Sequence, residues 1–522
     1  MWKKTEMKEM LASVASYRSF QELGRLPLWE ERLRANELEL SQFAAFPEIE
    51  GEPIQTAPRP AAPRPAAAQI KAVTRERRTS KAATLAAKVR SGEASATEVA
   101  ADYIKRAAAV ADMCFFTAFD VDDLMRQATF IDGRIARGED PGPLAGVPVP
   151  VKDYMYVRGY PRTGGTKAMP ASVGHDDAPV VASIRAAGAL IGGVTNLHEL
   201  AYGATGINPH FGRVANPRHP GRIIGGSSSG SAGAVAAGLT CLAVGTDTSG
   251  SIRIPSAFAG VVGFKPTYER VSRAGVMPLA WSLDHVGPIA DSVADAALLF
   301  SVMAGLPDSA TVPVIGNEKL RIGKPSNHFY NEVDAEILAN IEGVILALSA
   351  SGHEVRSIEL DGVEACLPIH VQTVSAEASQ AYWQPLMKNP ELLGEDVRVR
   401  LEVGQFLASV DYIKAQRMRT AMRDDLMSAF RDLDILITPT VAVLAPEIGA
   451  VDVVIDGKRR PLHPALTRFT TPFNQTGLPA ITLPCGINAD GLPIGLQLSA
   501  AYGNDIGLLR AAAIVEDVVA AL

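Results

Sequence analysis

Apolar and polar positions along the chain predict helices that alternate with short, wholly apolar strands. Apolar residues recur at helical spacing in 85–89, 97–110 and 180–187, with Ser95 as a capping residue of the second helix and Gly188 ending the third. Apolar runs without alternation predict strands at 147–151, 189–194, 242–245, 435–437 and 480–483. Continuous apolarity is typical of strands that are covered on both faces. The pattern therefore predicts an α/β fold with a sheet between layers of helices.

The N-terminal part follows a different pattern. Residues 1–50 carry apolar stripes at helical spacing, interrupted by Pro27 and Pro47, and this predicts two or three amphipathic helices. Residues 57–66 are rich in proline and alanine, which is typical of a semi-rigid linker. We predict three segments: a helical arm over 1–57, a linker over 58–68 and one large domain over 69–522. The arm is expected to pack on the main body or to serve in docking or oligomerisation.

Composition and charge exclude several classes of function. The 522 residues carry a formal net charge of −7, which is unlike the basic surface that nucleic-acid binding requires. No apolar run approaches the roughly 18 residues that cross a bilayer, so we expect no membrane partner. The histidines form no HExxH motif or His/Cys cluster, and we expect no metal and no cofactor. The four cysteines are far apart and predict thiols in the reducing cytoplasm: Cys114, Cys241, Cys366 and Cys485.

The segment Gly225–Thr267 carries the residues that indicate chemistry. A loop rich in glycine and serine, 225–231, precedes a run of small residues, 232–238, which predicts a helix lying close to its neighbours. A second such loop, 245–255, follows a short strand. A loop of this kind before a helix directs several backbone N–H groups to one place, which suits an anion or a developing oxyanion.

The first loop by itself allows three interpretations. A phosphate-binding loop would need a lysine directly after Gly230, and none is present. The run Gly226–Gly230 matches the GxSxG nucleophile elbow of α/β-hydrolases, in which Ser228 would be the nucleophile of an esterase. The preceding residues 218–222, however, are a poor strand from which to begin an elbow. The third interpretation is a turn without chemistry.

Further motifs bear on this choice. Together with Gly225–Thr267 they form a long pattern, present at 144–153, 195–203, 282–288, 472–480 and 491–497. This pattern resembles that of the amidase signature family over roughly residues 80–520. The resemblance implies an α/β fold with a central mixed β-sheet covered by helices on both faces, outside which the N-terminal helical extension lies. It also implies an amidohydrolase that acts on linear C–N bonds of amides without a cofactor.

The family uses a Ser–cis-Ser–Lys triad, and the resemblance assigns its members by their place in the motifs. Lys152, at the end of the Val-Lys-Asp run, is similar to the catalytic lysine. Ser227 is similar to the bridging serine, which is expected after a cis peptide bond, and Ser251 to the nucleophile. In such a triad a neutral lysine takes the proton of the nucleophile through the bridging serine, so burial must lower the lysine pKa from about 10.4.

The same resemblance implies supporting residues around the second loop. It assigns the oxyanion hole to the backbone N–H groups of Thr248, Ser249, Gly250 and Ser251. Ser249 departs from the family pattern, in which glycine is usual, and this puts the shape of the oxyanion loop in question. Asp247 and Arg253 are expected to brace the loop through hydrogen bonds, the alternative being a solvated ion pair of little energetic value. Ser228 is expected to support the triad.

Other polar and aromatic residues are weaker candidates. His198, His210 and His285 are expected to be structural or surface residues, and Glu199 to make local hydrogen bonds. Met155, Tyr382 and Trp383 are candidates for an acyl pocket, with ordinary core packing as the alternative.

The sequence favours a hydrolase that acts alone on a small-molecule amide, through an acyl-enzyme, as a possible homodimer. A second hypothesis is the A-type subunit of a glutamine-dependent amidotransferase, because Lys265–Thr267 and 270–273 also resemble that branch. A third is a binding protein that keeps the fold without catalysis.

Overall fold

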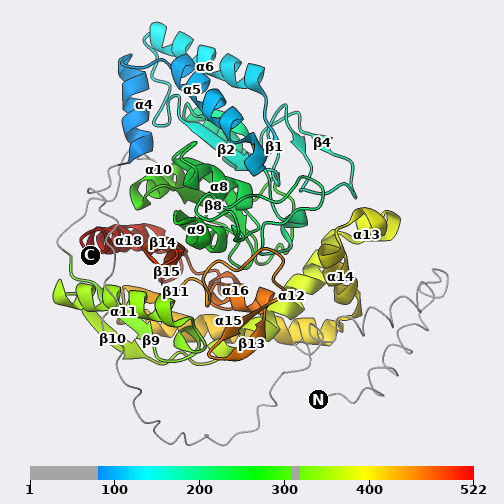
Figure 1. Cartoon of the computed structure of the whole chain (residues 1–522), viewed down its shortest axis with the longest axis vertical. Helices are drawn as coiled ribbons and strands as arrows, with labels where there is room; N and C mark the ends of the chain where they lie inside the picture. The colour runs from blue at the N-terminus through cyan, green and yellow to red at the C-terminus, as the bar shows by residue number, and fades with distance from the viewer. Residues whose placement is uncertain (1–79, 307–317) are drawn as a thin grey trace, which may run out of the picture.

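A mixed, 11-stranded β-sheet forms the centre of the computed structural model, which describes residues 80–306 and 318–522 (Figure 1). The predicted arm, 1–57, and linker, 58–68, lie outside the described residues. The strand order is β1-β5-β2-β6-β8-β7-β14-β15-β11-β9-β10. The strands are β1 Phe116–Ala118, β2 Pro148–Lys152, β5 Leu190–Thr195, β6 Leu242–Asp247, β7 Val262–Lys265, β8 His285–Ala290, β9 Arg321–Pro325, β10 Glu354–Ile358, β11 Ile435–Pro439, β14 Ala480–Ile487 and β15 Pro493–Ser499.

Two small two-stranded sheets lie beside the central one. They are β3 Pro161–Arg162 with β4 Ser172–Val173, and β12 Asp452–Ile455 with β13 Lys458–Pro461.

The α-helices are α4 Lys81–Ser91, α5 Ala96–Ala109, α6 Val121–Ala136, α7 Pro179–Ala186, α8 Ser229–Ala236, α9 Arg253–Ala259, α10 Val293–Met303, α11 Ala335–Ala350, α12 Cys366–Ala381, α13 Trp383–Lys388, α14 Glu395–Val403, α15 Ser409–Ala429, α16 Leu462–Thr467, α17 Thr471–Gln475 and α18 Asp505–Ala520.

The five strands expected from apolar runs are present and buried. Every residue of β2, β5, β6 and β11 is buried, and β14 is buried except near its end. Helices α8 and α10 both pack on β6 and β8. The predicted α/β architecture is therefore confirmed, and β2, β5, β6 and β11 lack alternation because neither of their faces meets solvent.

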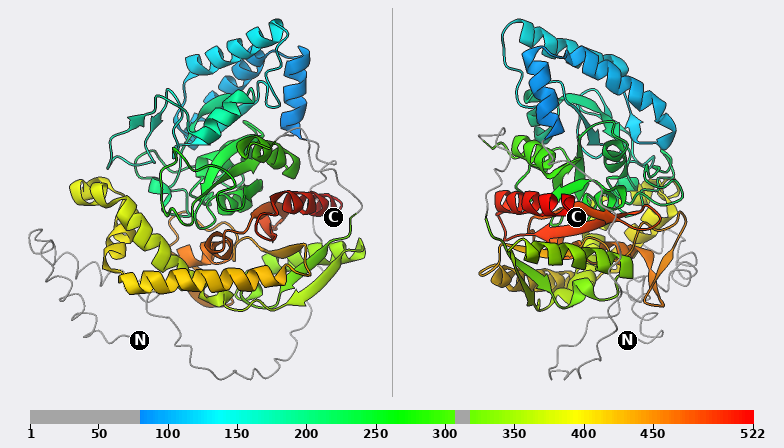
Figure 2. Two further views of the ribbon diagram at one scale, coloured as in Figure 1. Left: turned by 180° about the vertical axis from the view of Figure 1, so that it is seen from behind. Right: turned by 60° about the vertical axis from the view of Figure 1, so that its left-hand side comes forward.

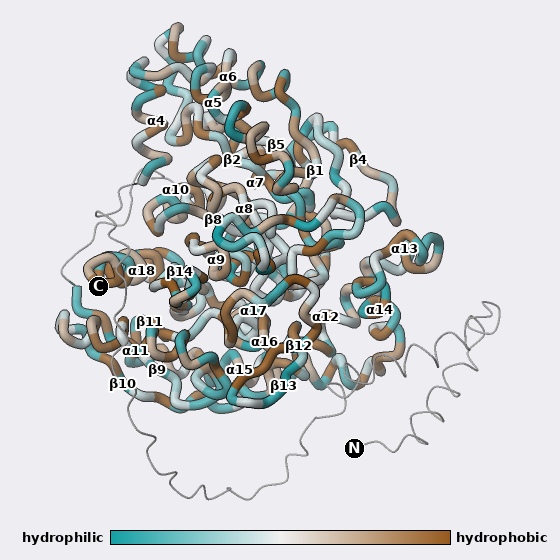
Figure 3. The backbone as a smooth tube through the Cα atoms, in the orientation of Figure 1, coloured by the Kyte–Doolittle hydropathy of each residue, from teal (hydrophilic) through white to brown (hydrophobic). Residues whose placement is uncertain are grey.

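Sequence signals also place the helix ends correctly. Ser95 caps α5 through a capping box in which its side chain accepts from the Glu98 N–H and Glu98 accepts from the Ser95 N–H. Helix α7 ends at Ala186, before Gly188 at φ +87°, a conformation that glycine adopts without strain. Buried residues of α6 recur at Leu124, Ala128 and Ile131, and Figure 3 shows apolar and polar stretches alternating along this outer helix.

The register of the sheet brings two loops to one edge. Strands β2 and β6 pair in parallel, with Val151 opposite Val244, so both run toward the same side of the sheet. Strand β2 ends at Lys152 and β6 ends at Asp247, just before the second glycine- and serine-containing loop. The carboxyl ends of adjacent parallel strands are a common place for ligand sites. The edge beyond Lys152 and Asp247 is therefore where the chemistry-bearing residues meet.

A second apolar cluster lies apart from the main core. It joins α12 to the chain segments that follow β2 and precede β8, through residues that include Tyr154, Met277, Leu283, Ala378 and Tyr382. Figure 2 shows α12 to α15 running below the part of the molecule that holds β2 and β6. The C-terminal half thus packs against the chain segments of the N-terminal half that follow β2 and precede β8.

Replacing Gly230 by alanine is expected to destabilise the fold. A Cβ at this position of α8 would lie 2.3 Å from the Phe115 carbonyl oxygen and 2.7 Å from the Asn196 backbone nitrogen, and neither backbone can move freely. We expect Gly230→Ala to lower the free energy of unfolding by about 1–3 kcal/mol in chemical denaturation.

Gly133→Ala in α6 is the matched control. A Cβ there meets only the far end of the Arg137 side chain, at 3.5 Å. This variant should be neutral or more stable by up to about 1 kcal/mol, because alanine favours the helix. Equal stability losses in the two variants would contradict the close approach of α8 to its neighbours.

Candidate active site

Lys152 lies at the centre of the predicted site and is fully buried. Its Nζ is 2.7 Å from Ser227 Oγ, 2.8 Å from Thr246 Oγ1 and 3.1 Å from Ser228 Oγ. Within 80–306 and 318–522 its amine forms no salt bridge with a carboxylate. The amine is thus surrounded by hydroxyl groups, which can donate to or accept from it.

Burial lowers the pKa of Lys152 to about 7, against the opposing effect of the negative charges of Asp247 and Asp284. Removing an ammonium from water disfavours its charged form, and nearby carboxylates only partly offset this. A large fraction of Lys152 is therefore neutral near pH 7. A neutral amine has a lone pair that can accept a proton.

The hydroxyl proton of Ser228 is already used. Ser228 Oγ donates to the Thr246 carbonyl at 3.0 Å, so it acts only as an acceptor toward Lys152. Ser227 follows a cis peptide bond, Gly226–Ser227, as the resemblance implies. Unlike Ser228 Oγ, Ser227 Oγ has only one hydrogen-bond partner in the described part of the chain, which is Lys152. The Ser227 hydroxyl is thus free to hand a proton to Lys152, whereas that of Ser228 is not.

This geometry argues against a nucleophile elbow at Ser228. The side chain of Ser228 is fully buried and bonded on both sides, and no strand precedes it between 213 and 228. Ser251 is 7% exposed, and its hydroxyl makes no hydrogen bond to any described residue. The Ser228 N–H donates to the Ser251 carbonyl at 3.1 Å, which holds the two serine-containing loops side by side.

Asp247 holds the second loop from inside. Its carboxylate accepts hydrogen bonds from the backbone N–H groups of Gly250, at 2.7 Å, and Ile252, at 3.1 Å. It also accepts from Asn474 Nδ2 at 2.8 Å. The positive charge of Arg253 and these hydrogen bonds outweigh burial and hold the pKa of Asp247 well below its usual range. The carboxylate therefore stays ionised and keeps the loop folded around it.

Arg253 joins the loop to the C-terminal strands. Its guanidinium bonds both carboxylate oxygens of Asp247 at 3.0 Å, and it donates to Gln497 Oε1 at 2.7 Å and Asn474 Oδ1 at 2.6 Å. Both members of the ion pair are fully buried. The alternative of a solvated ion pair is therefore wrong, because no part of either charged group meets water.

Three of the four N–H groups assigned to the oxyanion hole are free to donate. Those of Thr248, Ser249 and Ser251 have no acceptor in the described residues. The Gly250 N–H differs, because the Asp247 carboxylate accepts from it at 2.7 Å. Gly250 itself has φ +121°, and a Cβ there would lie 2.3 Å from Thr470 Oγ1, so glycine is required for conformation and space.

Several residues that contact the loop were not assigned a role from the sequence. Thr248 Oγ1 donates to Asp284 at 2.6 Å, and Ser249 Oγ lies 2.6 Å from His370 Nε2. Thr470 Oγ1 donates to the Ser249 carbonyl at 2.5 Å. Asp284 lies within one of the family motifs, but His370 lies in none, so only the tertiary structure could reveal its contact.

The weaker histidine candidates have partners away from Lys152 and Ser251. His198 Nε2 lies 2.9 Å from Asp396, and His210 Nε2 lies 2.9 Å from Glu199. Glu199 also accepts from Thr166, 33 positions away, and from the Gly394 N–H, 195 positions away, so its hydrogen bonds are structural but not local as expected. His285 Nδ1 lies 2.6 Å from the Leu283 carbonyl oxygen and 3.2 Å from that of Asp247, and burial holds the pKa of His285 well below the usual range.

The three acyl-pocket candidates separate in the structure. Tyr382 is buried, and its hydroxyl bonds that of Tyr154, whose ring centroid lies 5.6 Å from Lys152 Nζ. Met155 packs in the main core, and Trp383 is 39% exposed. Only Tyr382 is thus linked to the site.

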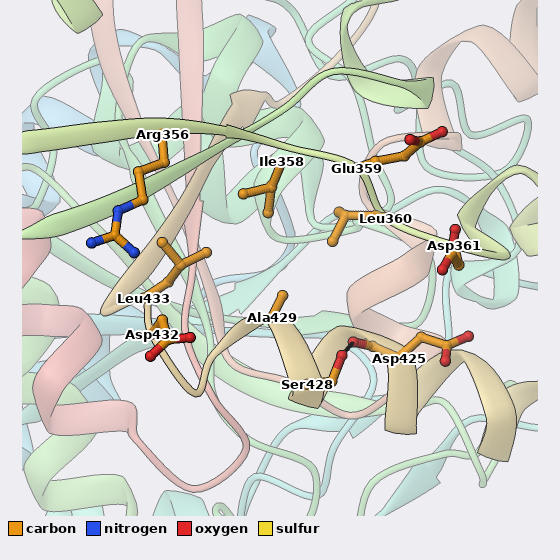
Figure 4. A pocket seen from close by; sticks show the side chains of 10 residues that line it. All are labelled: Arg356, Ile358, Glu359, Leu360, Asp361, Asp425, Ser428, Ala429, Asp432 and Leu433. Atoms are coloured by element: carbon orange, nitrogen blue, oxygen red, sulfur yellow. Dashed lines mark hydrogen bonds between the residues drawn. The ribbon is translucent and has the colours of Figure 1, made fainter.

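Two pockets differ in their relation to these residues. One of about 500 Å³ is lined by Met277, Trp281, Arg273 and Asp284, and of these residues Asp284 accepts a hydrogen bond from Thr248 in the oxyanion loop. Another of about 310 Å³ lies between β10 and the end of α15, and Figure 4 shows Arg356, Asp361, Asp425 and Asp432 around it. None of the residues assigned to the triad or the oxyanion hole lines either pocket.

Comparison with known proteins identifies the family. The model of the Amidase family matches residues 98–509. The chain belongs to the amidase signature family. The amidase of Pseudomonas putida is 40% identical over 424 residues, which cover 78% of this chain and 90% of that protein.

Two further similarities span almost the whole of the related proteins. The A-type subunit of the glutamyl-tRNA(Gln) amidotransferase of Koribacter versatilis (strain Ellin345) is 35% identical over 468 residues, covering 82% of this chain and 96% of the relative. A solved structure described as an amidase superposes with a TM-score of 0.79 at 35% identity, covering 83% of this chain and 98% of that one. The amidase signature fold is thus confirmed, and the chain is an amidohydrolase that acts on amide C–N bonds.

The described residues contain neither a metal-binding group nor a membrane span. No group of three or more histidine, cysteine, aspartate and glutamate side chains in 80–306 and 318–522 is arranged to hold a metal ion. Within the same ranges, no helix has the length and apolarity needed to cross a bilayer.

Replacing Arg253 by methionine is expected to disorder the loop and to destabilise the fold. The change leaves the Asp247 carboxylate buried without its ion-pair partner, which typically costs about 3–5 kcal/mol. The free energy of unfolding from chemical denaturation measures this loss.

Arg459→Met is the control for this prediction. Arg459 pairs with Asp452 at 3.1 Å, but its side chain is 78% exposed. Removing such a pair typically changes stability by less than about 1 kcal/mol. If Arg253→Met were as mild as Arg459→Met, the buried pair would not hold the loop.

Proposed function

We propose that this enzyme hydrolyses a carboxylic amide to the acid and ammonia or an amine through an acyl-enzyme on Ser251, with Ser227 and neutral Lys152 as proton relay. One observation carries the proposal. The Lys152 amine is fully buried, has no carboxylate partner in the described residues and lies 2.7 Å from Ser227 Oγ. A lysine in such a place is a poor structural cation and a good proton acceptor.

Each step of the relay moves one proton along the same path. Ser251 Oγ attacks the amide carbonyl carbon while its proton passes to Ser227 Oγ, and the proton of Ser227 passes to Lys152 Nζ. The carbonyl π electrons move to oxygen, and the N–H groups of Thr248, Ser249 and Ser251 stabilise the resulting oxyanion. When the tetrahedral intermediate collapses, the relay runs in reverse and protonates the departing nitrogen. A water molecule then attacks the acyl-enzyme with the same proton transfers and releases the acid.

The surroundings of the relay support these roles. Thr246 and Ser228 hold Lys152 Nζ in place, and the buried Asp247–Arg253 pair braces the loop that carries the oxyanion donors. We place the enzyme in the cytoplasm, as its four free thiols suggest, and we keep a homodimer as the expected assembly.

A second candidate function is glutamine-dependent amidotransfer. The relative from Koribacter versatilis is named as part of such an enzyme, and the match covers 96% of it. In this alternative the same relay would release ammonia from glutamine, and activity would require partner subunits.

Purified alone, the protein is expected to hydrolyse members of a panel of primary amides and anilides. Ser251→Ala should lower kcat/KM by at least about 1,000-fold and abolish labelling by a fluorophosphonate probe, because the nucleophile is lost. Lys152→Met and Ser227→Ala should each give a loss of similar size.

Ser183→Ala is the matched control, since the Ser183 hydroxyl only bonds the Pro179 carbonyl within α7. Glutaminase activity that appears only with added partner subunits would favour the amidotransferase. Labelling that persists in Ser251→Ala and is lost in Ser228→Ala would favour the esterase, and no labelling at all would favour a binding protein.

The activity is expected to rise with pH. The active form of Lys152 is neutral and its pKa is about 7, so kcat/KM should increase as pH rises through about 7 and then level off. Asp284→Asn removes a negative charge that raises the pKa of Lys152, and should move the midpoint to lower pH. Initial rates between pH 5 and 10 measure both profiles, and a flat wild-type profile would contradict a titrating lysine.

A further inference from the structure

Two buried carboxylates hold different ends of the oxyanion loop. Asp247 accepts from the backbone N–H groups of Gly250 and Ile252, so it fixes the later part of the loop. Thr248, at the start of the loop, is held by Asp284 instead, whose carboxylate accepts from Thr248 Oγ1 at 2.6 Å. Both Thr248 and Asp284 are buried. The start of the loop therefore depends on a residue outside it.

Asp284 is itself held in place by the turn that precedes β8. Its carboxylate also accepts from the backbone N–H groups of Leu279, at 2.9 Å, and Ala280, at 3.1 Å. In the same turn, the Ser282 N–H donates to the Glu377 carboxylate on α12 at 3.0 Å. Burial raises the pKa of Asp284 to about 6, so above pH 7 this carboxylate is mostly ionised and only accepts hydrogen bonds. Thr248 is therefore anchored to a fixed acceptor.

The peptide unit that carries the Thr248 N–H has a defined direction. Its carbonyl, which is that of Asp247, accepts from Asn474 Nδ2 at 3.1 Å, and Asn474 Oδ1 accepts from Arg253, which fixes the orientation of the amide. The C=O and N–H of a trans peptide point in opposite directions, so the Thr248 N–H points away from Asn474. No described residue accepts from this N–H.

The Thr248 side chain adds a second restraint on the same backbone. A β-branched side chain has few rotamers open to it, so a hydroxyl anchored at Asp284 limits the rotation of the residue that bears it. Asn474 restrains the carbonyl side of the peptide unit, and Asp284 restrains the side chain beyond the N–H. Loss of the Asp284 contact would leave this N–H in place but free to turn.

We propose that Asp284 is a positioning residue for catalysis, which holds the Thr248 N–H in the direction that stabilises the oxyanion. Asp284 acts through the Thr248 side chain and does not touch the substrate. This inference rests on the proposed hydrolysis at Ser251. Removing an oxyanion donor outright typically lowers kcat about 100- to 1,000-fold, so a donor that is present but misaligned is expected to cost about 10- to 100-fold.

Thr248→Val is the sharpest test, because it replaces the hydroxyl by a methyl group and keeps the N–H. We expect kcat on the best amide of the panel, and the rate of Ser251 labelling by a fluorophosphonate probe, to fall about 10- to 100-fold with little change in KM. Thr248→Ser keeps the hydroxyl and should restore most of both rates. Should the valine variant not fold, Thr248→Ala carries the same expectation.

Asp284→Asn removes the acceptor from the other side. One of its side-chain atoms would be an N–H donor facing the backbone N–H groups of Leu279 and Ala280, so the side chain should turn away from the position that holds Thr248. We expect a loss of kcat similar to that in Thr248→Val. The double variant should lose no more than either single variant, because both changes break the same contact.

The pH profile separates positioning from the charge of Asp284. Thr248→Val keeps that charge, so the plateau of kcat/KM should fall while the midpoint stays near 7. Asp284→Asn should lower the plateau and also move the midpoint to lower pH. Thr129→Val in α6 is the matched control, because the Thr129 hydroxyl bonds the Met125 carbonyl within the same helix, and it should change neither rate nor profile.

Four results would overturn the inference: a Thr248→Val variant with wild-type kcat and labelling, a loss that comes from a higher KM alone, a loss in Thr248→Ser as large as in Thr248→Val, or losses that multiply in the double variant. A loop that had only lost its fold would give the second of these, together with a lower melting temperature. A wild-type chain that the fluorophosphonate probe does not label refutes the proposed function itself, and the role of Asp284 with it.

Discussion

The buried carboxylate of Asp247 is the constraint on which the arrangement of the site depends. It stands at the end of β6, accepts from the backbone of Gly250 and Ile252, and pairs with Arg253 without contact with water. A charge in such a place persists only when every lone pair finds a donor, so the loop must fold around it. Arg253 extends the same network to Gln497 on β15, which ties the loop to the C-terminal strands.

This pairing also affects the proton relay. An unpaired carboxylate near Lys152 would favour the ammonium form, whereas the adjacent guanidinium of Arg253 offsets much of that charge. Burial then prevails, and the pKa of Lys152 falls to about 7. The ion pair therefore has two effects: it shapes the loop that carries Ser251, and it leaves the lysine basic enough to accept a proton yet largely neutral.

Helix α12 connects the parts of the site that come from distant segments. His370 contacts Ser249 in the oxyanion loop, and Glu377 accepts from the Ser282 N–H and hydroxyl, two residues before Asp284. At the end of the helix the Tyr382 hydroxyl meets that of Tyr154, two residues after Lys152. One helix thus lies against three loops of the site and holds them relative to one another.

The sequence alone determined the buried strands, the capped helices and the motif positions of Lys152, Ser227 and Ser251, because each depends on local residue pattern. The contact of Lys152 with Ser227 joins residues 75 positions apart, and only the parallel pairing of β2 with β6 and the packing of α8 bring them together. The bond from Arg253 to Gln497 across 244 positions, and the approach of His370 to Ser249 across 121 positions, were likewise decided by tertiary structure. Residue patterns report local conformation and burial, whereas which buried polar groups satisfy one another depends on how the whole chain packs.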